Sequence, residues 1–157
     1  MTSSVRGIPE GYHSVTPYLA VDDGARAIGF YKEAFGATEV MRVPGPGGKV
    51  GHAEIRIGDS RIMLADEYPD MGFRSPRSYG GSPVGLHLYV VDVDAVARQA
   101  VAAGARELRP VKDQFYGDRT GSFEDPFGHV WHIATRKEDL SPVEMQRRAE
   151  QAMQQGG

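Results

Sequence analysis

An internal repeat constrains the fold of this chain more than any other feature of the sequence. Sliding the sequence on itself by 68 or 69 positions lays "YLAVDDGARAIGFYKEAFGATEV" (18–40) over "HLYVVDVDAVARQAVAAGAREL" (87–108). Both segments show the pattern of a strand, an acidic turn, a helix, a Gly-Ala pair and a second strand. Because a long repeat of this kind corresponds to one supersecondary unit, the chain is expected to contain two copies of one module.

Local signals mark the ends of each expected helix. Asp22 or Asp23 can cap the first helix by accepting hydrogen bonds from its first amides, and Asp92 or Asp94 can cap the second. A glycine follows each helical segment, which is the residue type that most often ends a helix. Between these signals the apolar residues recur at helical spacing.

After each helix the apolar pattern changes to a period of two residues, which is typical of strands. The segment "GHAEIRIGDSRIMLAD" (51–66) predicts two strands joined by a Gly-Asp-Ser turn, and its counterpart is "RTGSFEDPFGHVWHIAT" (119–135). The offset of 69 places Met63 in register with His132. Each module is therefore predicted to be β-α-β-β-β.

The predicted organisation has four parts. The first module covers 12–66, a linker rich in Pro, Gly and Ser covers 67–83, the second module covers 84–136, and a tail covers 137–157. A Ser-Pro-Val-Glu capping box predicts a helix over 142–153 in the tail. That helix has a narrow apolar stripe of Met145, Ala149, Ala152 and Met153.

Composition excludes several classes of function. The net charge of −3 and the pI near 5.9 give no basic surface for nucleic acid or for an anionic membrane. The absence of cysteine excludes disulfides, thiol nucleophiles and cysteine metal sites. No segment has the apolar core of a signal peptide or the roughly 18 apolar residues of a membrane span. We therefore expect a cytoplasmic protein.

The duplicated module, with "AVDDGARAIGFYKEAFG" in its first copy and "DPFGHVWHIAT" in its second, resembles the vicinal oxygen chelate superfamily over residues 12–136. That superfamily includes glyoxalase I, extradiol dioxygenases and bleomycin-resistance proteins, and the longer strings resemble its PhnB-like branch. The resemblance implies an α+β fold in which the two modules form a curved, mixed, eight-stranded sheet with a ligand cavity on its concave face. It also implies pairing of modules, and we expect a homodimer.

The same resemblance allows the family's metal positions to be located in this chain. Counting from the acidic turns places them at Thr16, Met63, Gly85 and His132. A useful site needs about three protein ligands, and only the histidine binds a divalent metal well. The sequence therefore predicts a protein that binds a small molecule without a catalytic metal, as bleomycin-resistance proteins do.

An enzyme is the alternative prediction. A replacement metal site of two histidines and one carboxylate could be formed by His87, His132 and Glu54. Alternatively, a histidine could act as a general base without a metal. Either arrangement would give a lyase, an isomerase or a dioxygenase. The same histidines are equally compatible with a packing role, hydrogen-bonded inside the protein.

Strand alternation predicts which side chains face the cavity. Trp131 and Ile133 are the better core residues, so His132 between them is expected to point to the opposite face. The strand candidates for ligand contact are Tyr18, His52, Glu54, Met63, His87, Tyr89 and His132. The segment "KDQFYGDRT" (112–120) is expected to be a recognition loop contributing Phe115, Tyr116 and Arg119. The alternative for His52 and Glu54 is a solvated sheet face. The alternative for the 112–120 segment is an ordinary turn in which Arg119 forms a surface ion pair.

Overall fold

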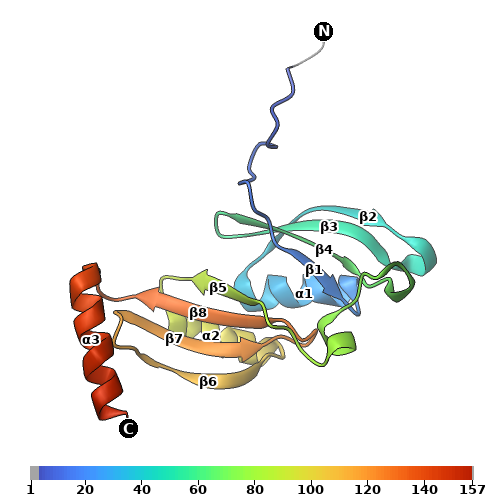
Figure 1. Cartoon of the computed structure of the whole chain (residues 1–157). Coiled ribbons are helices and arrows are strands. Elements are labelled where there is room, and N and C mark those ends of the chain that lie inside the picture. Colours follow the sequence, from blue (N-terminus) through green and yellow to red (C-terminus); the bar gives the residue numbers. More distant parts are fainter. Residues whose placement is uncertain (1–3, 157) are drawn as a thin grey trace. The chain divides into compact units, whose positions relative to one another are not determined.

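The computed structural model describes residues 4–156. The chain divides into two compact units, of which the first ends at Gly80 and the second begins at Gly81. Each unit contains one copy of the repeat, and each has its own sheet and its own covering helix (Figure 1). The predicted α+β class is confirmed.

The first unit is a four-stranded mixed sheet with one long helix. Its elements are β1 (Tyr18–Val21), α1 (Gly24–Phe35), β2 (Thr38–Pro44), β3 (Val50–Ile57) and β4 (Ser60–Asp66), with 3-10 turns at η1 (Pro46–Gly48), η2 (Pro69–Met71) and η3 (Pro76–Tyr79). The strand order is β1-β4-β3-β2, in which β1 runs parallel to β4 and the other neighbours are antiparallel.

The second unit repeats this arrangement and adds a terminal helix. Its elements are β5 (Gly85–Tyr89), α2 (Val93–Ala103), β6 (Arg106–Asp113), β7 (Asp118–Glu124), β8 (Val130–Arg136) and α3 (Pro142–Gln155). The order β5-β8-β7-β6 matches the first unit strand for strand, with β5 parallel to β8. The eight predicted strands thus form two mixed sheets of four.

The registers of the two sheets confirm the repeat. Tyr18 lies opposite Met63 in the first sheet, and His87 lies opposite His132 in the second. Both members of the second pair are 69 residues after their counterparts, as the sequence offset requires. Positions in the two modules can therefore be compared one by one.

The predicted helix caps are present, and the structure selects between the alternatives. The side chain of Asp23 accepts a hydrogen bond from the Arg26 amide at 3.1 Å, and that of Asp92 accepts one from the Ala95 amide at 3.2 Å. Gly36 ends α1 in the left-handed conformation, with φ of 67°. A residue with a Cβ would be strained there, which explains the glycine.

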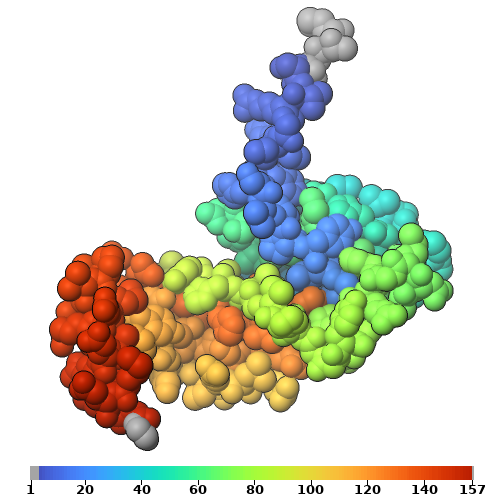
Figure 2. Space-filling view, in the orientation of Figure 1, coloured from blue at the N-terminus to red at the C-terminus, as the bar shows by residue number. Residues whose placement is uncertain are grey.

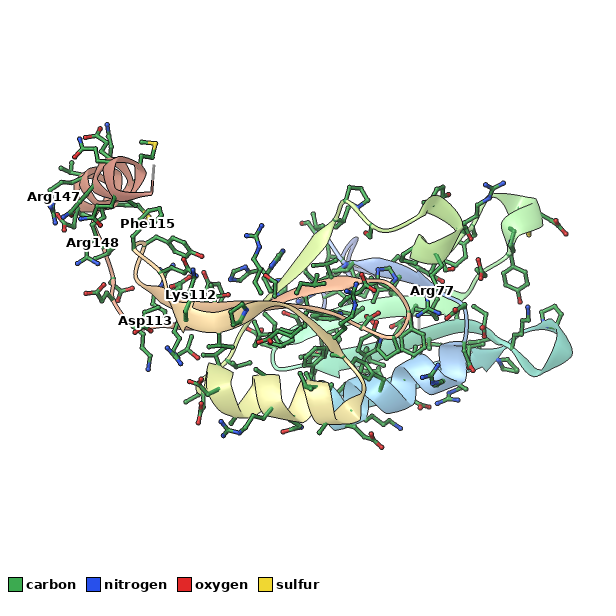
Figure 3. The ribbon with its side chains drawn as sticks, turned by 90° about the horizontal axis from the view of Figure 1, so that it is seen from below. Arg77, Lys112, Asp113, Phe115, Arg147 and Arg148 are labelled. Carbon is green, nitrogen blue, oxygen red and sulfur yellow. The ribbon has the colours of Figure 1, made fainter. Side chains whose placement is uncertain are left out.

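Each helix buries its apolar face against one side of its own sheet (Figure 3). In the first unit Ala27, Ile28 and Tyr31 of α1 are buried, as are the sheet residues Val21, Ala53 and Ile55. In the second unit Val93 and Ala100 of α2 are buried, as are Phe123, Trp131 and Ile133. Alternation along the strands therefore turns His52, Glu54 and His132 toward the opposite side of their sheets.

Helix α3 stands at one end of the second unit as an exposed ridge (Figure 2). It begins as predicted, with Ser141 accepting a hydrogen bond from the Glu144 amide at 3.1 Å. In its predicted apolar stripe, Met145, Ala149 and Ala152 are half-buried, whereas Met153 is 72% exposed. Within the described part of the chain, no helix is long and apolar enough to cross a membrane.

Candidate functional site

The second unit contains a polar pocket on the sheet face that α2 does not cover. Its volume is about 580 Å³, which lies within the range of small-molecule sites. All four strands of the sheet and the β6–β7 turn supply its walls: His87, Arg109, Pro110, Lys112, Gln114, Tyr116, Thr120, Ser122 and His132. Three of the side chains predicted from the sequence line this pocket, namely His87, Tyr116 and His132.

His132 lines the pocket from strand β8. It lies between the buried residues Trp131 and Ile133 on β8, so its ring projects to the pocket side, as the alternation predicted. Its Nδ1 is 2.8 Å from the Ser122 hydroxyl oxygen, and its ring centroid is 6.1 Å from that of His87. These contacts fix the orientation of the imidazole.

Gly85 explains how this ring fits against the sheet. A Cβ atom built on Gly85 would lie 2.6 Å from Nε2 of His132, which is closer than real Cβ atoms approach other atoms. The imidazole therefore occupies the space that a side chain at position 85 would fill. The glycine is needed here for close approach and not for an unusual backbone angle.

The basic wall of the pocket comes from strand β6. Arg109 lies opposite Ser122 and Lys112 lies opposite Thr120, so three steps along β6 match two steps along β7. In a regular strand, residues three apart face opposite sides. The extra residue of this β-bulge allows Arg109 and Lys112 to line the same pocket.

The charged side chains that line the pocket, Arg109 and Lys112, are both basic. Burial lowers the pKa of His132 below its ordinary value, and the nearby positive charges of His87 and Arg109 lower that pKa further. Among the described residues that line the pocket, none is acidic. Arg109, Lys112, Gln114 and Tyr116 all carry hydrogen-bond donors. The pocket is chemically suited to an anion.

Tyr116 gives the pocket an aromatic wall. Burial raises the pKa of its phenol, and the nearby carboxylate of Asp118 raises that pKa further, so the ring stays neutral and hydrogen-bonding at physiological pH. The adjacent Phe115 packs edge-on against it at a centroid distance of 5.2 Å. Phe115 itself is 41% exposed and does not line the pocket.

Two other residues predicted for the site lie elsewhere. The guanidinium of Arg119 forms two hydrogen bonds with Asp94 of α2, at 2.9 and 3.0 Å, so it lies on the helix side of the sheet. The hydroxyl of Tyr89 donates to Asp118 at 3.1 Å, and neither residue lines the pocket. Tyr89 instead borders a more apolar hollow of about 660 Å³ formed with Val90, Val91, Thr135 and Arg136.

In the first unit, the predicted site residues bind one another. The hydroxyl of Tyr18 is 2.7 Å from His52 Nδ1, and His52 Nε2 is 2.7 Å from Glu54 Oε2. Tyr12, from the N-terminal segment, donates its hydroxyl to the other oxygen of Glu54. Met63 lies beside Tyr18 in the register and is half-buried. Tyr18, His52 and Glu54 therefore bind one another and Tyr12 within the unit.

The residues at the family's metal positions do not fit a metal. Gly85 has no donor atom, and the His132 ring fills the space beside it. Met63 offers only a thioether, which suits soft ions. The carboxylate of Glu54, from the replacement set, already bonds to His52 and Tyr12. Over residues 4–156 no group of three or more His, Asp or Glu side chains is placed to hold a metal ion.

Sequence reasoning missed the basic wall and the hydroxyl residues beside His132. Alternation alone cannot reveal Arg109 and Lys112 as neighbours, because a bulge shifts the register between them. A signal was available, since Pro110 lies between them and proline within a strand is typical of an edge or a bulge. Ser122 is paired with His132, and Thr120 lies two residues before it on β7. Both side chains therefore point to the same face of the sheet as His132, which is the pocket side.

Comparison with known proteins places this geometry in context. The family model described as the glyoxalase/bleomycin resistance protein/dioxygenase superfamily matches residues 11–133. An uncharacterised protein of Mycobacterium bovis is 46% identical over 136 residues, covering 85% of this chain and 90% of the relative. An uncharacterised protein of Arabidopsis thaliana is 30% identical over 118 residues, covering 71% of this chain and 70% of the relative.

Solved structures share the fold at lower identity. The crystal structure of TioX from Micromonospora is 25% identical, with a TM-score of 0.61, covering 82% of this chain and all (100%) of TioX. A PhnB protein from Bacillus cereus, described as a possible 3-demethylubiquinone-9 3-methyltransferase, is 20% identical with a TM-score of 0.62, covering 78% and 99% of the two chains. At 20% identity, the match to the Bacillus cereus protein shows a shared fold only.

Proposed function

Because this chain belongs to the glyoxalase/bleomycin resistance protein/dioxygenase superfamily, whose fold hosts unrelated chemistries, we propose a function from the pocket itself. The second module binds a small organic anion around His132, and it does so without a catalytic metal.

One observation supports this proposal above the others. The guanidinium of Arg109, the ammonium of Lys112 and the imidazole of His132 converge on one pocket whose described lining contains no carboxylate. Charge-assisted hydrogen bonds to an oxyanion are roughly twice as strong as neutral ones. An anionic head group is therefore the ligand chemistry that this pocket would stabilise most.

The remaining residues indicate what the rest of the ligand looks like. Tyr116 offers a flat face on which an aromatic or conjugated group can pack. Ser122 holds His132 through Nδ1, and Thr120 donates its own hydroxyl to the Ile133 carbonyl at 2.8 Å. These hydroxyls stabilise the protein side of the pocket, while Arg109, Lys112 and Tyr116 contact the ligand.

An enzyme that uses His132 as a base is the second candidate. The lowered pKa of His132, caused by burial and by the charges of His87 and Arg109, keeps the ring unprotonated near neutral pH. An unprotonated imidazole can accept a proton from a bound substrate. Turnover of a bound anion, lost in His132→Gln but with binding retained, would favour this candidate.

The test uses benzoate and phenylphosphonate as probes, titrated into the protein and followed by calorimetry and by the NMR signals of the histidine rings. We expect both probes to shift the His132 signals, and His132→Ala to weaken binding by about tenfold, equivalent to about 1.4 kcal/mol. His13→Ala is the matched control, because His13 is exposed in the N-terminal segment. Equal binding by both variants, or no binding by the wild type at millimolar probe, would contradict the proposal.

We also propose that the protein is a homodimer. Strands β1 and β5 are edge strands of their sheets and carry backbone groups without a neighbouring strand in the same sheet. Such edges are commonly covered by pairing. Sedimentation at micromolar concentration should give twice the chain mass of 17.1 kDa, and a purely monomeric species would contradict this.

A further inference from the structure

Arg148 of helix α3 links three parts of the second unit. Its Nη1 donates to the backbone carbonyl of Phe115 at 3.3 Å and to Glu138 at 2.6 Å, and its Nε donates to Glu144 at 3.0 Å. Figure 3 shows Arg148 and Phe115 close together between α3 and the tip of the β6–β7 hairpin. The Arg148 side chain is 28% exposed, whereas that of the adjacent Arg147 is 61% exposed.

The hairpin turn is also held from the segment that precedes α3. The carbonyl of Gly117 accepts hydrogen bonds from the amides of Lys137 at 2.8 Å and Glu138 at 3.0 Å. A Cβ atom on Gly117 would lie 2.8 Å from the Glu138 carbonyl oxygen, so the two segments are in direct contact. Gly117 also has a φ of 93°, which disfavours any other residue.

This turn forms part of the pocket wall. Gln114 and Tyr116 line the pocket, and Phe115, whose carbonyl Arg148 binds, lies between them. Displacement of the Phe115 backbone would therefore move both neighbouring side chains. Within the turn, the Gln114 amide donates to the Asp118 carbonyl at 2.8 Å and the Gly117 amide donates to the Gln114 carbonyl at 3.2 Å, so these bonds are local.

Charged contacts hold α3 against the unit, and the apolar residues Met145, Ala149 and Ala152 of the helix are only half-buried. No described residue of α3 is buried. Hydrogen bonds from Arg147 and then Arg148 lower the pKa of Glu144 to about 2, so this carboxylate stays ionised throughout the physiological pH range. The ion pairs of Arg148 with Glu138 and Glu144 orient its guanidinium toward the turn.

We propose that Arg148 is a positioning residue for the pocket: through it, the C-terminal helix holds the 114–117 turn so that Gln114 and Tyr116 form the wall against which the anion binds. This inference rests on the function proposed above and extends it to a helix that contributes no residue to the pocket lining.

The experiment compares Arg148→Ala with Arg147→Ala and Arg148→Lys. Arg147 is the matched control, because its guanidinium donates to Glu144 within the same helix. The first measurement is amide hydrogen exchange of residues 114–117 and 138 without any probe. We expect about tenfold faster exchange there in Arg148→Ala, with the β8 amides unchanged, and no effect in Arg147→Ala.

The second measurement is the binding of phenylphosphonate by the same variants. We expect Arg148→Ala to raise Kd by roughly fivefold at an unchanged melting temperature, and Arg148→Lys to restore part of the affinity, since an ammonium keeps the charge but loses the planar fork. A purely structural role for Arg148 would lower the melting temperature without changing the ratio between the Kd values of the variants.

The outcomes separate this inference from the proposed function. Equal exchange or equal Kd in Arg148→Ala and Arg147→Ala overturns the positioning role, even if the wild type binds the probe well. If the wild type binds neither probe, the proposed function fails and the binding role of Arg148 fails with it, while the exchange data alone still decide whether Arg148 holds the turn.

Discussion

The two modules share one fold but differ in what occupies the sheet face opposite their helices. In the first module Tyr18, His52 and Glu54 form a line of hydrogen bonds that ends on Tyr12. In the second module the corresponding face holds the pocket around His132. The backbone is therefore common to both modules, and the side chains at equivalent positions decide whether a pocket remains.

The registers allow this difference to be followed residue by residue. Glu54 lies opposite Met63 as Ser122 lies opposite His132. On the next strand, Met41 is paired with Glu54 where the second module has Arg109 paired with Ser122. Val43 is paired with His52, and Lys112 is paired with Thr120. The basic wall is thus specific to the second module.

The largest effect is expected at equivalent positions of β4 and β8, where different side chains accept hydrogen bonds from buried backbone amides. Asp66, which is 5% exposed, accepts hydrogen bonds from the amides of Gly24 and Val50, whereas Thr135, 69 residues later, accepts one from the Val93 amide. Asp66→Ala leaves two buried donors without a partner and should cost about 3 kcal/mol, and Thr135→Ala about 1.5 kcal/mol. Urea unfolding followed by circular dichroism measures both, and a larger cost for Thr135→Ala would break the comparison.

The next largest effect concerns the basic wall. Giving the second module the residues of the first, as Arg109→Met with Lys112→Val, should weaken phenylphosphonate binding by about a hundredfold, or about 2.7 kcal/mol. Both residues are exposed on an edge strand, so stability should change by less than about 0.5 kcal/mol. Arg106→Met, on the same strand but outside the pocket, is the calorimetric control and should bind normally. Unchanged binding in the double variant would show that these charges are not used.

A smaller effect is expected from the pH dependence of the second module. The pKa of His132 is lowered in the folded protein by burial and by the charges of His87 and Arg109, so the unfolded chain binds the proton more readily. Stability should therefore fall as the pH drops through about 6.5, and His132→Gln should lose that part of the dependence. An anion in the pocket should raise the pKa of His132, which NMR titration with and without benzoate measures. A pKa unaffected by a bound probe would place the probe elsewhere.

The smallest expected effect is that of metal removal. Since the residues at the family's metal positions in both modules lack a ligand set, EDTA should leave the melting temperature unchanged, and metal analysis of untagged protein should find well under one equivalent of Zn, Ni, Mn or Fe. Stoichiometric metal whose loss destabilises either module would contradict the metal-free proposal.

Much of the fold followed from local patterns in the sequence. The repeat predicted both modules, the acidic turns predicted the caps, and the offset of 69 predicted that Met63 and His132 are equivalent. These signals are reliable because hydrophobic periodicity and capping act over a few residues. The placement of His132 on the face opposite Trp131 followed from the same alternation.

The site was predicted less completely, for identifiable reasons. The bulge between Arg109 and Lys112 depends on pairing with another strand, and no local pattern encodes it. Arg119 was assigned to a loop, but it lies in β7 next to the pocket-facing Thr120, so alternation turns it toward α2. Tyr89 shares its strand face with His87 but lies beyond the pocket, where Asp118 binds it.

The close contact between Gly85 and His132 limits how this pocket can change. Any side chain introduced at position 85 would meet the imidazole, which Ser122 holds in place. A donor at 85 and the present orientation of His132 therefore exclude each other. A side chain with a metal-binding atom at position 85 would therefore require the His132 ring to leave its present place, and with it the hydrogen bond to Ser122.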